Sequence, residues 1–572
     1  MKHISDPQHT INQRLHKLYP KEIAQRAVND LIDLIFQYKQ RINSQPYRLS
    51  EKDVILISYG DQVNLYQEPP LKTLNEFMNK YLDGTINSIH ILPFYPSSSD
   101  SGFSVVNYNA VNPRMGSWRE IDNISSRYRL MVDGVINHTS QFSDWFQAYL
   151  DGDEYFEDFF IEMDPSTDLS RVVRPRATPL LTEFVDSDGK IHNIWTTFSI
   201  DQVDLNYKNH RVLRNVLDAL FYYIEKGAKL IRLDAIAFIW KEVGTACVHL
   251  PQTHELIQLM REVLHEVAPE VIIITETNVP HHENVSYFGS GDDEAQMVYN
   301  FALPPLLAHS ILHGDTKALT NWAKTLALPS NKVCFFNFTA SHDGVGLRPI
   351  KGILSDDEIN YLVSRVQEHG GLVSFRTEED GSQSAYELNC SYIDILTHPD
   401  EEDMLRIKRM LLSQGTALAM PGVPGIYFQS LVGSRNYHEG VKRTGINRMI
   451  NREKFNIRWL ENEFSKQSSL SNIIFDSYRR LISIRINEKA FNPFGHFSFL
   501  DLDPRLFITE RGCSENIERI LAIHNFSNEQ VKCTIPDEIT LPLKDLLSSY
   551  EVDETRVVLL EPYQMMWLKG SL

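Results

Sequence analysis

The feature that most constrains this chain is an alternation, from residue 53 onward, of short β-rich runs with amphipathic stretches of helical period. Seven such runs follow one another: VILISYG, INSIHILPF, RLMVDGVIN, AKLIRLDAI, EVIIITET, VCFFNF and GTALAMPGVPGIYF. Strands separated by helices pair in parallel, because each helix returns the chain to the edge where the next strand starts. The number of units favours an eight-stranded (β/α)8 TIM barrel over a short doubly wound sheet. We therefore predict an α/β fold built on such a barrel.

Three segments depart from this alternation. Residues 1–52 carry apolar positions at helical spacing and then a polar break, which predicts a helical N-terminal extension. Residues 140–208 are far longer than a loop between strand and helix, and predict a subdomain inserted after the third strand. Residues 489–572 contain short alternating strands, which predict a C-terminal β domain. The catalytic barrel then comprises residues 53–139 and 209–488.

Composition and charge narrow the range of partners. The 572 residues are 42% hydrophobic and 10% aromatic, enough for a large core. A formal net charge of −19 argues against nucleic acid or an anionic membrane as a partner, and an anionic ligand would need a local basic pocket. The sequence has neither the apolar core of a signal peptide nor an uninterrupted apolar run of about 18 residues, so we predict an unprocessed cytoplasmic protein. The oligomeric state stays open, a homodimer included.

Cysteine and histidine patterns predict neither disulfides nor a metal centre. The five cysteines are scattered singly without C-x-x-C spacing, which is typical of reduced structural thiols. The adjacent His281 and His282 lack a third ligand at suitable spacing. We predict that the protein uses no metal and no cofactor.

Charged residues interrupt three of the apolar strands near their C-terminal ends. In IRLDAIAF, Arg232 and Asp234 lie two residues apart and share one face of the strand. Glu276 ends a second strand, and His342 with Asp343 follows a third. A buried ion pair with a purely structural role would be enough to explain Arg232 and Asp234, but not the charged residues of the other two strands. Three carboxylates at three strand ends are better explained by convergence on one site, because this edge of a barrel is its catalytic face.

Five short motifs resemble the signatures of the α-amylase superfamily of glycoside hydrolases, which is built on a (β/α)8 barrel. They are DGVINH (133–138), QVDLN (202–206), IRLDAIAF (231–238), ITET (274–277) and ASHDG (340–344). Within the superfamily, LPFYPSSSDSGFSVVNY, RPRATPLLT, PGVPGIYF and GINRMINR resemble the sucrose phosphorylase group, over nearly the whole chain.

Two positions differ from the sucrose-specific members of this group. At the acid/base motif, the sucrose-specific members have a sequence that resembles Glu-Val-His, whereas this chain has Glu276, Thr277 and Asn278. In the acceptor-site loop, those members carry Tyr-Gln, whereas this chain has Tyr386 and Glu387. Both departures resemble the glucosylglycerate phosphorylase branch.

The resemblance implies a retaining double displacement, in which two carboxyl groups lie about 5–5.5 Å apart across the anomeric carbon. Asp234 would be the nucleophile and Glu276 the general acid/base. Asp343 would stay ionised and stabilise the transition state. Arg232 would keep Asp234 ionised, since an opposite charge within a few ångströms lowers the pKa of a carboxylate.

The same resemblance implies the groups that bind the glucosyl unit. His138 and His342 resemble histidines that bind glucose hydroxyls. Asp100 and Arg448 resemble the pair that closes the pocket at its far side, and Arg452, nearby in GINRMINR, is the alternative to Arg448.

Phosphorolysis requires positive charge, because a phosphate dianion has to approach three carboxylates. The stretch RVVRPRATP supplies Arg171, Arg174 and Arg176, of which Arg176 resembles the phosphate ligand of the family; ordinary surface arginines are the alternative. Tyr386 and Glu387 would form the acceptor wall.

A glycerate acceptor adds one further negative charge to this site. Asn278 and the arginine loop would supply hydrogen-bond donors, and His281 or His282 is a candidate for one more. Glu387 would then bind a glycerate hydroxyl.

We therefore predict a retaining α-glucoside phosphorylase, a glycosyltransferase that cleaves 2-O-α-glucosylglycerate with phosphate to α-glucose 1-phosphate and glycerate. Its partners would be this small-molecule sugar and inorganic phosphate. A sucrose phosphorylase, and a hydrolase or transglucosidase on the same barrel, are the alternatives. A non-catalytic relative is disfavoured, because all three carboxylates are present.

Overall fold

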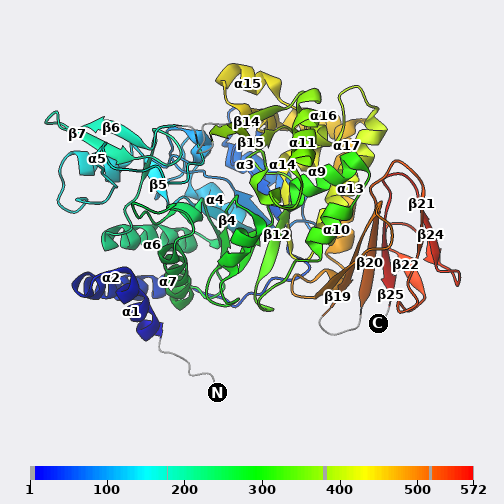
Figure 1. Cartoon of the computed structure of the whole chain (residues 1–572), viewed down its shortest axis with the longest axis horizontal. Helices are drawn as coiled ribbons and strands as arrows, with labels where there is room; N and C mark the ends of the chain where they lie inside the picture. The colour runs from blue at the N-terminus through cyan, green and yellow to red at the C-terminus, as the bar shows by residue number, and fades with distance from the viewer. Residues whose placement is uncertain (1–6, 177, 378–382, 514–517, 571–572) are drawn as a thin grey trace.

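The computed structural model describes residues 7–176, 178–377, 383–513 and 518–570. Eight parallel strands close into a barrel surrounded by helices (Figure 1). In order around the barrel the strands are β1 (Ile55–Ser58), β16 (Val423–Tyr427), β12 (Cys334–Phe338), β11 (Met297–Tyr299), β10 (Ile272–Thr275), β9 (Ala228–Leu233), β4 (Arg129–Gly134) and β3 (Ser88–Ile91). The predicted (β/α)8 fold is confirmed.

The sequence prediction missed one barrel strand, β11, which has only three residues and follows the polar stretch GSGDDEAQ. Its register is fixed on both sides, because Met297 lies opposite Ile274 of β10 and Cys334 of β12. The run GTALAMPGVPGIYF is split: its first residues end helix α13 (Asp403–Ala419), and only its last residues form β16. A continuous apolar run does not by itself distinguish a buried helix end from a strand.

The helices pack with their apolar faces toward the barrel. Along α6, buried residues recur at the spacing of one helical face, as at Val212, Val216 and Leu220. The helices of this unit besides α13 are α3 (Pro70–Tyr81), α4 (Trp118–Ser125), α6 (His210–Glu225), α7 (Pro251–Val267), α8 (His281–Asn284), α9 (Leu303–His313), α10 (Lys317–Ala323), α11 (Asp356–Glu368), α12 (Tyr392–Leu396), α14 (Phe428–Val432), α15 (His438–Thr444), α16 (Ile457–Phe464) and α17 (Leu470–Arg485).

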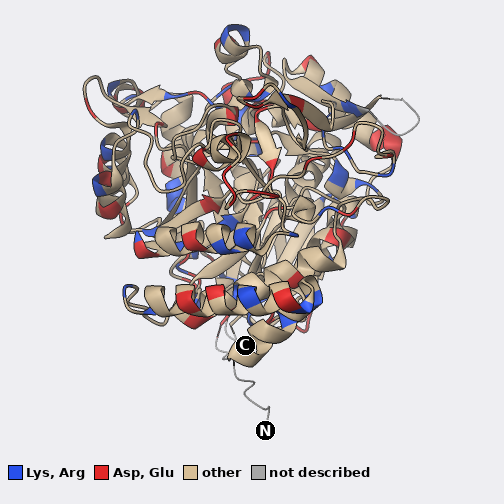
Figure 2. Cartoon of the chain, turned by 90° about the vertical axis from the view of Figure 1, so that its left-hand side faces the viewer, with Lys and Arg blue, Asp and Glu red and all other residues tan. Residues whose placement is uncertain are grey.

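Two N-terminal helices, α1 (Pro7–Leu18) and α2 (Lys21–Lys39), pack against α6 and α7 (Figure 1). Tyr38 of α2 donates a hydrogen bond to Asp218 of α6 (2.8 Å). Arg14 of α1 pairs with Glu255 of α7 (3.0 Å). Basic and acidic side chains are interspersed along the helices on this side of the molecule (Figure 2), which is typical of a solvated outer face.

Between β4 and β9 the chain forms a small unit of its own (Figure 1). It contains β5 (His138–Ser140) paired with β8 (Gln202–Asp204), helix α5 (Asp144–Leu150), and the hairpin of β6 (Leu181–Val185) and β7 (Ile191–Trp195). A buried lysine joins this unit to the barrel: Lys241 Nζ donates to Asn137 Oδ1 (2.7 Å) and lies 2.6 Å from Asp204 Oδ2. The insertion after the third strand therefore shares a buried ion pair with the loop that follows β9.

Two small sheets lie outside the barrel. The hairpin of β14 (Leu372–Thr377) and β15 (Gln383–Asn389) pairs with β13 (Val345–Gly346), and β2 (Val63–Asn64) pairs separately with β17 (Phe455–Asn456). Because Gly346 lies opposite Glu387, the hairpin brings Tyr386 and Glu387 next to the ASHDG motif.

The C-terminal β domain is also confirmed. Its six-stranded sheet has the order β18 (His496–Leu500), β19 (Leu506–Gly512), β20 (Arg519–Asn525), β25 (Met565–Gly570), β22 (Leu543–Asp545) and β23 (Glu551–Val552), and β21 (Val531–Thr534) pairs with β24 (Val557–Leu560). Two buried arginines, Arg485 of α17 and Arg511 of β19, donate to backbone carbonyls in the last residues of α13 and in the turn that precedes β16. The exact domain boundaries remain predictions. Within the described ranges, every helix falls short of the length and apolar character that crossing a membrane requires.

Candidate active site

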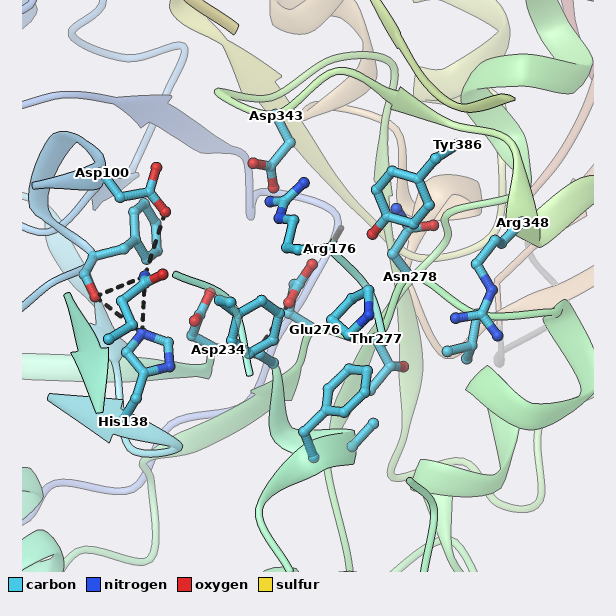
Figure 3. Close-up of a pocket in the computed structure, with 18 of the residues that line it drawn as sticks. Asp100, His138, Arg176, Asp234, Glu276, Thr277, Asn278, Asp343, Arg348 and Tyr386 are labelled. Atoms are coloured by element: carbon cyan, nitrogen blue, oxygen red, sulfur yellow. Dashed lines mark hydrogen bonds between the residues drawn. The ribbon is translucent and has the colours of Figure 1, made fainter. Parts of the chain in front are cut away.

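A pocket opens where the loops after β9, β10 and β12 meet the inserted unit (Figure 3). The predicted site residues that line it are Asp100, His138, Arg176, Asp234, Glu276, Asn278, His342, Asp343, Tyr386 and Arg448. The other residues named in the prediction lie outside this lining: Arg171, Arg174, Arg232, His281, His282, Glu387 and Arg452.

Asp234 and Glu276 meet at one guanidinium. They directly follow β9 and β10, which are neighbours in the barrel. Arg232 Nη1 donates to Asp234 Oδ1 (2.8 Å), and Arg232 Nη2 lies 3.7 Å from Glu276 Oε2. The backbone N–H of Ala235, a residue in the left-handed conformation (φ 48°), donates to the same Glu276 oxygen (3.1 Å). One cation and one strained peptide therefore hold the two carboxyl groups together.

Arg232 is held in turn by two groups beneath the pocket. Its side chain is 2% exposed and pairs with Asp133 of β4, whose second oxygen lies 2.8 Å from His90 Nε2 of β3. An apolar strand carries Arg232 because three carboxylates surround it, and their charges offset the cost of burying the guanidinium.

Burial raises the pKa of both carboxyl groups. The carboxylates of Glu276, Asp133 and Asp343 raise the pKa of Asp234 further, to about 8. Arg232 lowers the pKa of Asp234, as predicted, but burial outweighs that effect. For Glu276, burial and Asp343 also raise the pKa, and Arg232 again opposes them. The pair therefore retains one proton near neutral pH. Because Arg232 is closer to Asp234, we assign the charge to Asp234 and the proton to Glu276.

Asp343 has the opposite electrostatic setting. Its Oδ1 lies 2.5 Å from Arg448 Nη1 and 3.6 Å from His342 Nε2. Burial opposes ionisation, yet Arg448, followed by His342 and Arg452, lowers the pKa of Asp343 well below its usual range. Asp343 is consequently a fixed negative charge.

Glu387 does not form a wall of the pocket, in contrast to the prediction. It is 1% exposed and accepts hydrogen bonds from both Arg448 Nε (2.9 Å) and Arg448 Nη2 (2.6 Å). The Gly344 N–H and the Asn389 side chain also donate to its Oε1, each at 2.7 Å. Because both Glu387 oxygens are engaged by these donors and Glu387 lies outside the lining, its role is to hold Arg448 against Asp343.

His138 and Asp100 lie together at one end of the pocket (Figure 3). The side-chain nitrogen of Gln202 lies 3.1 Å from His138 Nε2 and 3.4 Å from Asp100 Oδ2. Burial lowers the pKa of His138, which favours its neutral form. Asp100 and Ser101 both have left-handed backbones (φ 48° and 52°), a strain that is typical of functional sites.

Arg452, rather than Arg448, lies at this end. Its Nη1 donates to Ser101 Oγ (2.9 Å), and its Nε donates to the carbonyl of His342 (2.7 Å). The ring of His342 stacks on Phe103 with centroids 4.9 Å apart. Arg448 lines the pocket, whereas Arg452 is buried and lies outside the lining, so the choice between the two for closing the pocket remains a prediction.

Of the three arginines in RVVRPRATP, the structure brings only Arg176 to the pocket. Its guanidinium lies 5.9 Å from the ring centre of Tyr386. Arg171 is exposed, and Arg174 is exposed and donates to the backbone carbonyl of Thr178. Arg174 therefore binds a backbone carbonyl of its own loop and does not line the pocket.

The end of the pocket opposite Asp100 is formed by Asn278 and Arg348 (Figure 3). Arg348 begins a one-turn 3-10 helix (Arg348–Ile350), and the sequence prediction did not include it. Asn278 packs against Gly346, where a Cβ would lie 2.5 Å from the side-chain amide. Its Oδ1 is buried and has no hydrogen-bond partner.

The histidine pair does not reach this pocket. The ring of His281 packs against Trp322 and Phe335, and the side chain of His282 is 82% exposed. The described part of the chain contains no cluster of three or more His, Cys, Asp or Glu side chains that would suit a metal ion.

Comparison with known proteins agrees with this geometry. Residues 80–344 match the family described as Alpha amylase, catalytic domain. A glucosylglycerate phosphorylase from Spirochaeta thermophila is 44% identical over 532 residues, which cover 91% of this chain and 90% of the relative. The chain belongs to the α-amylase family, in its glucosylglycerate phosphorylase branch.

Further relatives support this placement of the enzyme. A glucosylglycerate phosphorylase from Escherichia coli is 43% identical, with 91% of this chain and 92% of the relative covered. The crystal structure of sucrose 6F-phosphate phosphorylase from Thermoanaerobacter thermosaccharolyticum aligns with a TM-score of 0.73 at 23% identity, covering 84% of this chain and 95% of that one. This structural similarity shows that the two proteins share a fold.

The sequence of this α-amylase family enzyme predicts the three carboxylates of the site, but the prediction missed several residues that lie next to them. Gln202 stands inside the quoted motif QVDLN, and Phe103 inside LPFYPSSSDSGFSVVNY, so both motifs contain the signal. Arg348 follows the ASHDG motif by four residues, in GLRPI, and a search for cations just beyond each motif would have found it.

Proposed function

We propose that this enzyme cleaves 2-O-α-glucosylglycerate with phosphate to α-glucose 1-phosphate and glycerate, with retention of configuration. The observation that carries the proposal is the contact of Asp234 and Glu276 with one guanidinium, on the floor of a pocket that Arg176 also lines. The names of the relatives at 43% and 44% identity support the choice of donor.

In the first step, an Asp234 oxygen attacks the anomeric carbon as the bond to the glycerate oxygen breaks. Glu276 gives its proton to that oxygen, so glycerate leaves with its hydroxyl restored. Asp343, held ionised by Arg448, stabilises the positive charge that develops on the sugar ring.

In the second step, a phosphate oxygen attacks the same carbon and the bond to Asp234 breaks, which releases α-glucose 1-phosphate. The attacking species is hydrogen phosphate, and Glu276 accepts its proton as the new bond forms, which returns Glu276 to the protonated form it has at the start of the cycle. Arg176 offsets the charge of the incoming phosphate, which must approach Asp234, Glu276 and Asp343.

The test is a donor panel of glucosylglycerate, sucrose, sucrose 6′-phosphate and glucosylglycerol, each incubated with and without phosphate. We expect phosphate-dependent release of glucose 1-phosphate, with the highest kcat/KM for glucosylglycerate. A higher kcat/KM for sucrose would identify a sucrose phosphorylase instead. Free glucose released at the same rate with and without phosphate would identify a hydrolase.

We also propose that the enzyme is cytoplasmic and that it forms a homodimer. All five cysteines are buried thiols outside any disulfide, which suits a reducing compartment. Cell fractionation and light scattering of the purified enzyme would test these two points.

A further inference from the structure

We infer that Asn284 is a positioning residue for the acid/base steps, because it holds the backbone segment of Glu276 through the hydroxyl of Thr277. Asn284 lies outside the lining of the pocket, so it acts through its neighbours. The inference rests on the proposed function, in which Glu276 transfers a proton, and it adds the residue that fixes this carboxyl group in place.

The segment that carries Glu276 lies beyond the end of its strand. Strand β10 ends at Thr275, and residues 276–280, all of which the structure describes, lie outside any helix or strand. The Glu276 N–H donates to the carbonyl of Leu233 (3.2 Å), which continues the pairing with β9 by one residue. Thr277 and Asn278 follow Glu276 along the lining of the pocket (Figure 3). The position of Glu276 therefore depends on contacts made beyond the strand.

Two hydrogen bonds join this segment to the end of the neighbouring strand. The hydroxyl of Thr277 donates to Asn284 Oδ1 (2.6 Å), and Asn284 Nδ2 donates to the carbonyl of Tyr299 (2.7 Å), the last residue of β11. Thr277 and Asn284 are 2% and 1% exposed, so removing one partner leaves the other as a buried, unpaired polar group. The amide of Asn284 thus binds the acid/base segment at one end and the barrel at the other.

Helix α8 gives Asn284 a fixed position. The ring of His281, at the start of this helix, packs against Trp322 of α10 with centroids 5.6 Å apart. Glu283 Oε2 lies 3.2 Å from Nε2 of His249, in the loop that leads into α7. The support of Asn284 is therefore attached to two parts of the barrel's outer layer.

The expected effect of the relay concerns the placement of a proton donor. Glu276 has to lie within hydrogen-bond distance of the glycosidic oxygen, and a misplacement of about 1 Å can cost about 100-fold in rate. Removing Asn284 takes the acceptor from the Thr277 hydroxyl and lets the segment shift relative to Asp234. Steps that need Glu276 should slow, whereas attack by Asp234 should not.

The experiment compares two reactions of the wild type and Asn284→Ala. Cleavage of glucosylglycerate with phosphate needs proton transfer by Glu276 in both steps. With α-glucosyl fluoride and azide, Asp234 displaces fluoride and azide then displaces Asp234 to give glucosyl azide, and neither step moves a proton. We expect Asn284→Ala to lower kcat of the first reaction about 10- to 100-fold and that of the second by less than about threefold.

Variants of Thr277 test the relay while leaving α8 intact. Thr277→Val lacks the hydroxyl at nearly the same shape and should show the same selective loss, and Thr277→Ser should recover most of it. Because both residues act in one relay, the losses of Asn284→Ala and Thr277→Val should not multiply in the double variant. Asn525→Ala is the matched control, since Asn525 is fully buried in β20 of the C-terminal sheet. It should change both reactions by the same factor.

The outcomes separate the inference from the proposed function. If Asn284→Ala and Thr277→Val slow both reactions equally, or raise the KM for glucosylglycerate at an unchanged kcat, the inference alone is overturned. If Asn284→Ala does not fold, the two Thr277 variants decide by the same criteria. A wild type that releases no glucose 1-phosphate from glucosylglycerate would overturn the proposed function and the inference with it.

Discussion

Arg448 donates to both oxygens of Glu387, at 2.9 and 2.6 Å, while its remaining terminal nitrogen lies 2.5 Å from Asp343. Glu387 thus acts on the pocket through Arg448. Replacing Glu387 by Gln removes the charge that orients this guanidinium, so we expect a loss of about 1–3 kcal/mol in the free energy of unfolding. We also expect a lower kcat with glucosylglycerate, because Asp343 loses its fixed partner.

Chemical denaturation and steady-state kinetics check this expectation, with the exposed Glu368→Gln as the control. A variant with unchanged stability and a raised KM for glycerate alone would restore the interpretation of Glu387 as an acceptor contact.

The nucleophile gives the second prediction. Asp234→Asn should lower turnover by several orders of magnitude, since the two-step route depends on the covalent intermediate. Its stability should equal or exceed that of the wild type, because burial and three neighbouring carboxylates disfavour the charge at this position. Turnover within tenfold of the wild type would exclude Asp234 as the nucleophile.

The acid/base residue gives a pH dependence. Burial raises the pKa of Glu276, so its proton is retained to a higher pH than in a free glutamate and is lost as the pH rises through that raised value. We therefore expect kcat/KM for glucosylglycerate to fall on the alkaline side. Glu276→Gln should abolish turnover of glucosylglycerate yet still accept glucose from α-glucosyl fluoride, whose leaving group needs little acid help. Equal losses with both donors would contradict this role.

Arg176 gives the fourth prediction. Arg176→Ala should weaken phosphate binding by about 1.5–3 kcal/mol, the scale of a charge-assisted hydrogen bond. The KM for phosphate measures this loss, and Arg171→Ala, in the same loop but exposed, is the matched control. If the two variants have the same KM for phosphate, the loop does not bind phosphate.

Lys241 gives a prediction about stability. Its ammonium group and Asp204 are both buried, at 4% and 0% exposure of their side chains. Lys241→Met leaves Asp204 as an uncompensated buried charge and should cost about 3–5 kcal/mol in the free energy of unfolding. The exposed pair of Lys208 with Glu242 provides the control, since Lys208→Met should cost less than about 1 kcal/mol. Similar losses in both variants would show that the buried pair has no special role.

The barrel and its three carboxylates could be predicted from the sequence because both produce local patterns in it. A charged residue at the end of an apolar strand, as at Asp234 and Glu276, is visible without any knowledge of the fold. The strand Met297–Tyr299 could not be predicted, because three residues are too few to show the alternation of apolar and polar side chains that identifies a strand.

Contacts between distant segments account for the rest. Glu387 and Arg448 are 61 residues apart, and only the fold shows that they bind each other. Arg174 and Arg176 have the same charge and nearly the same position in the sequence, but the turn of the loop brings only Arg176 to the pocket. Arg348 was missed because the loop around it shows neither helical nor strand periodicity.

The C-terminal sheet is hydrogen-bonded to the segment that leads into barrel strand β16, which limits its exchange between related enzymes. Arg511 of β19 donates to the carbonyls of Ala419 and Met420 (3.0 and 2.8 Å), just before β16 begins. A chimera with a foreign sheet that lacks this arginine would leave two buried acceptors without donors in the wall of the barrel. The recombination point for such chimeras therefore belongs upstream of α13, so that Arg511 and the segment it binds are inherited together.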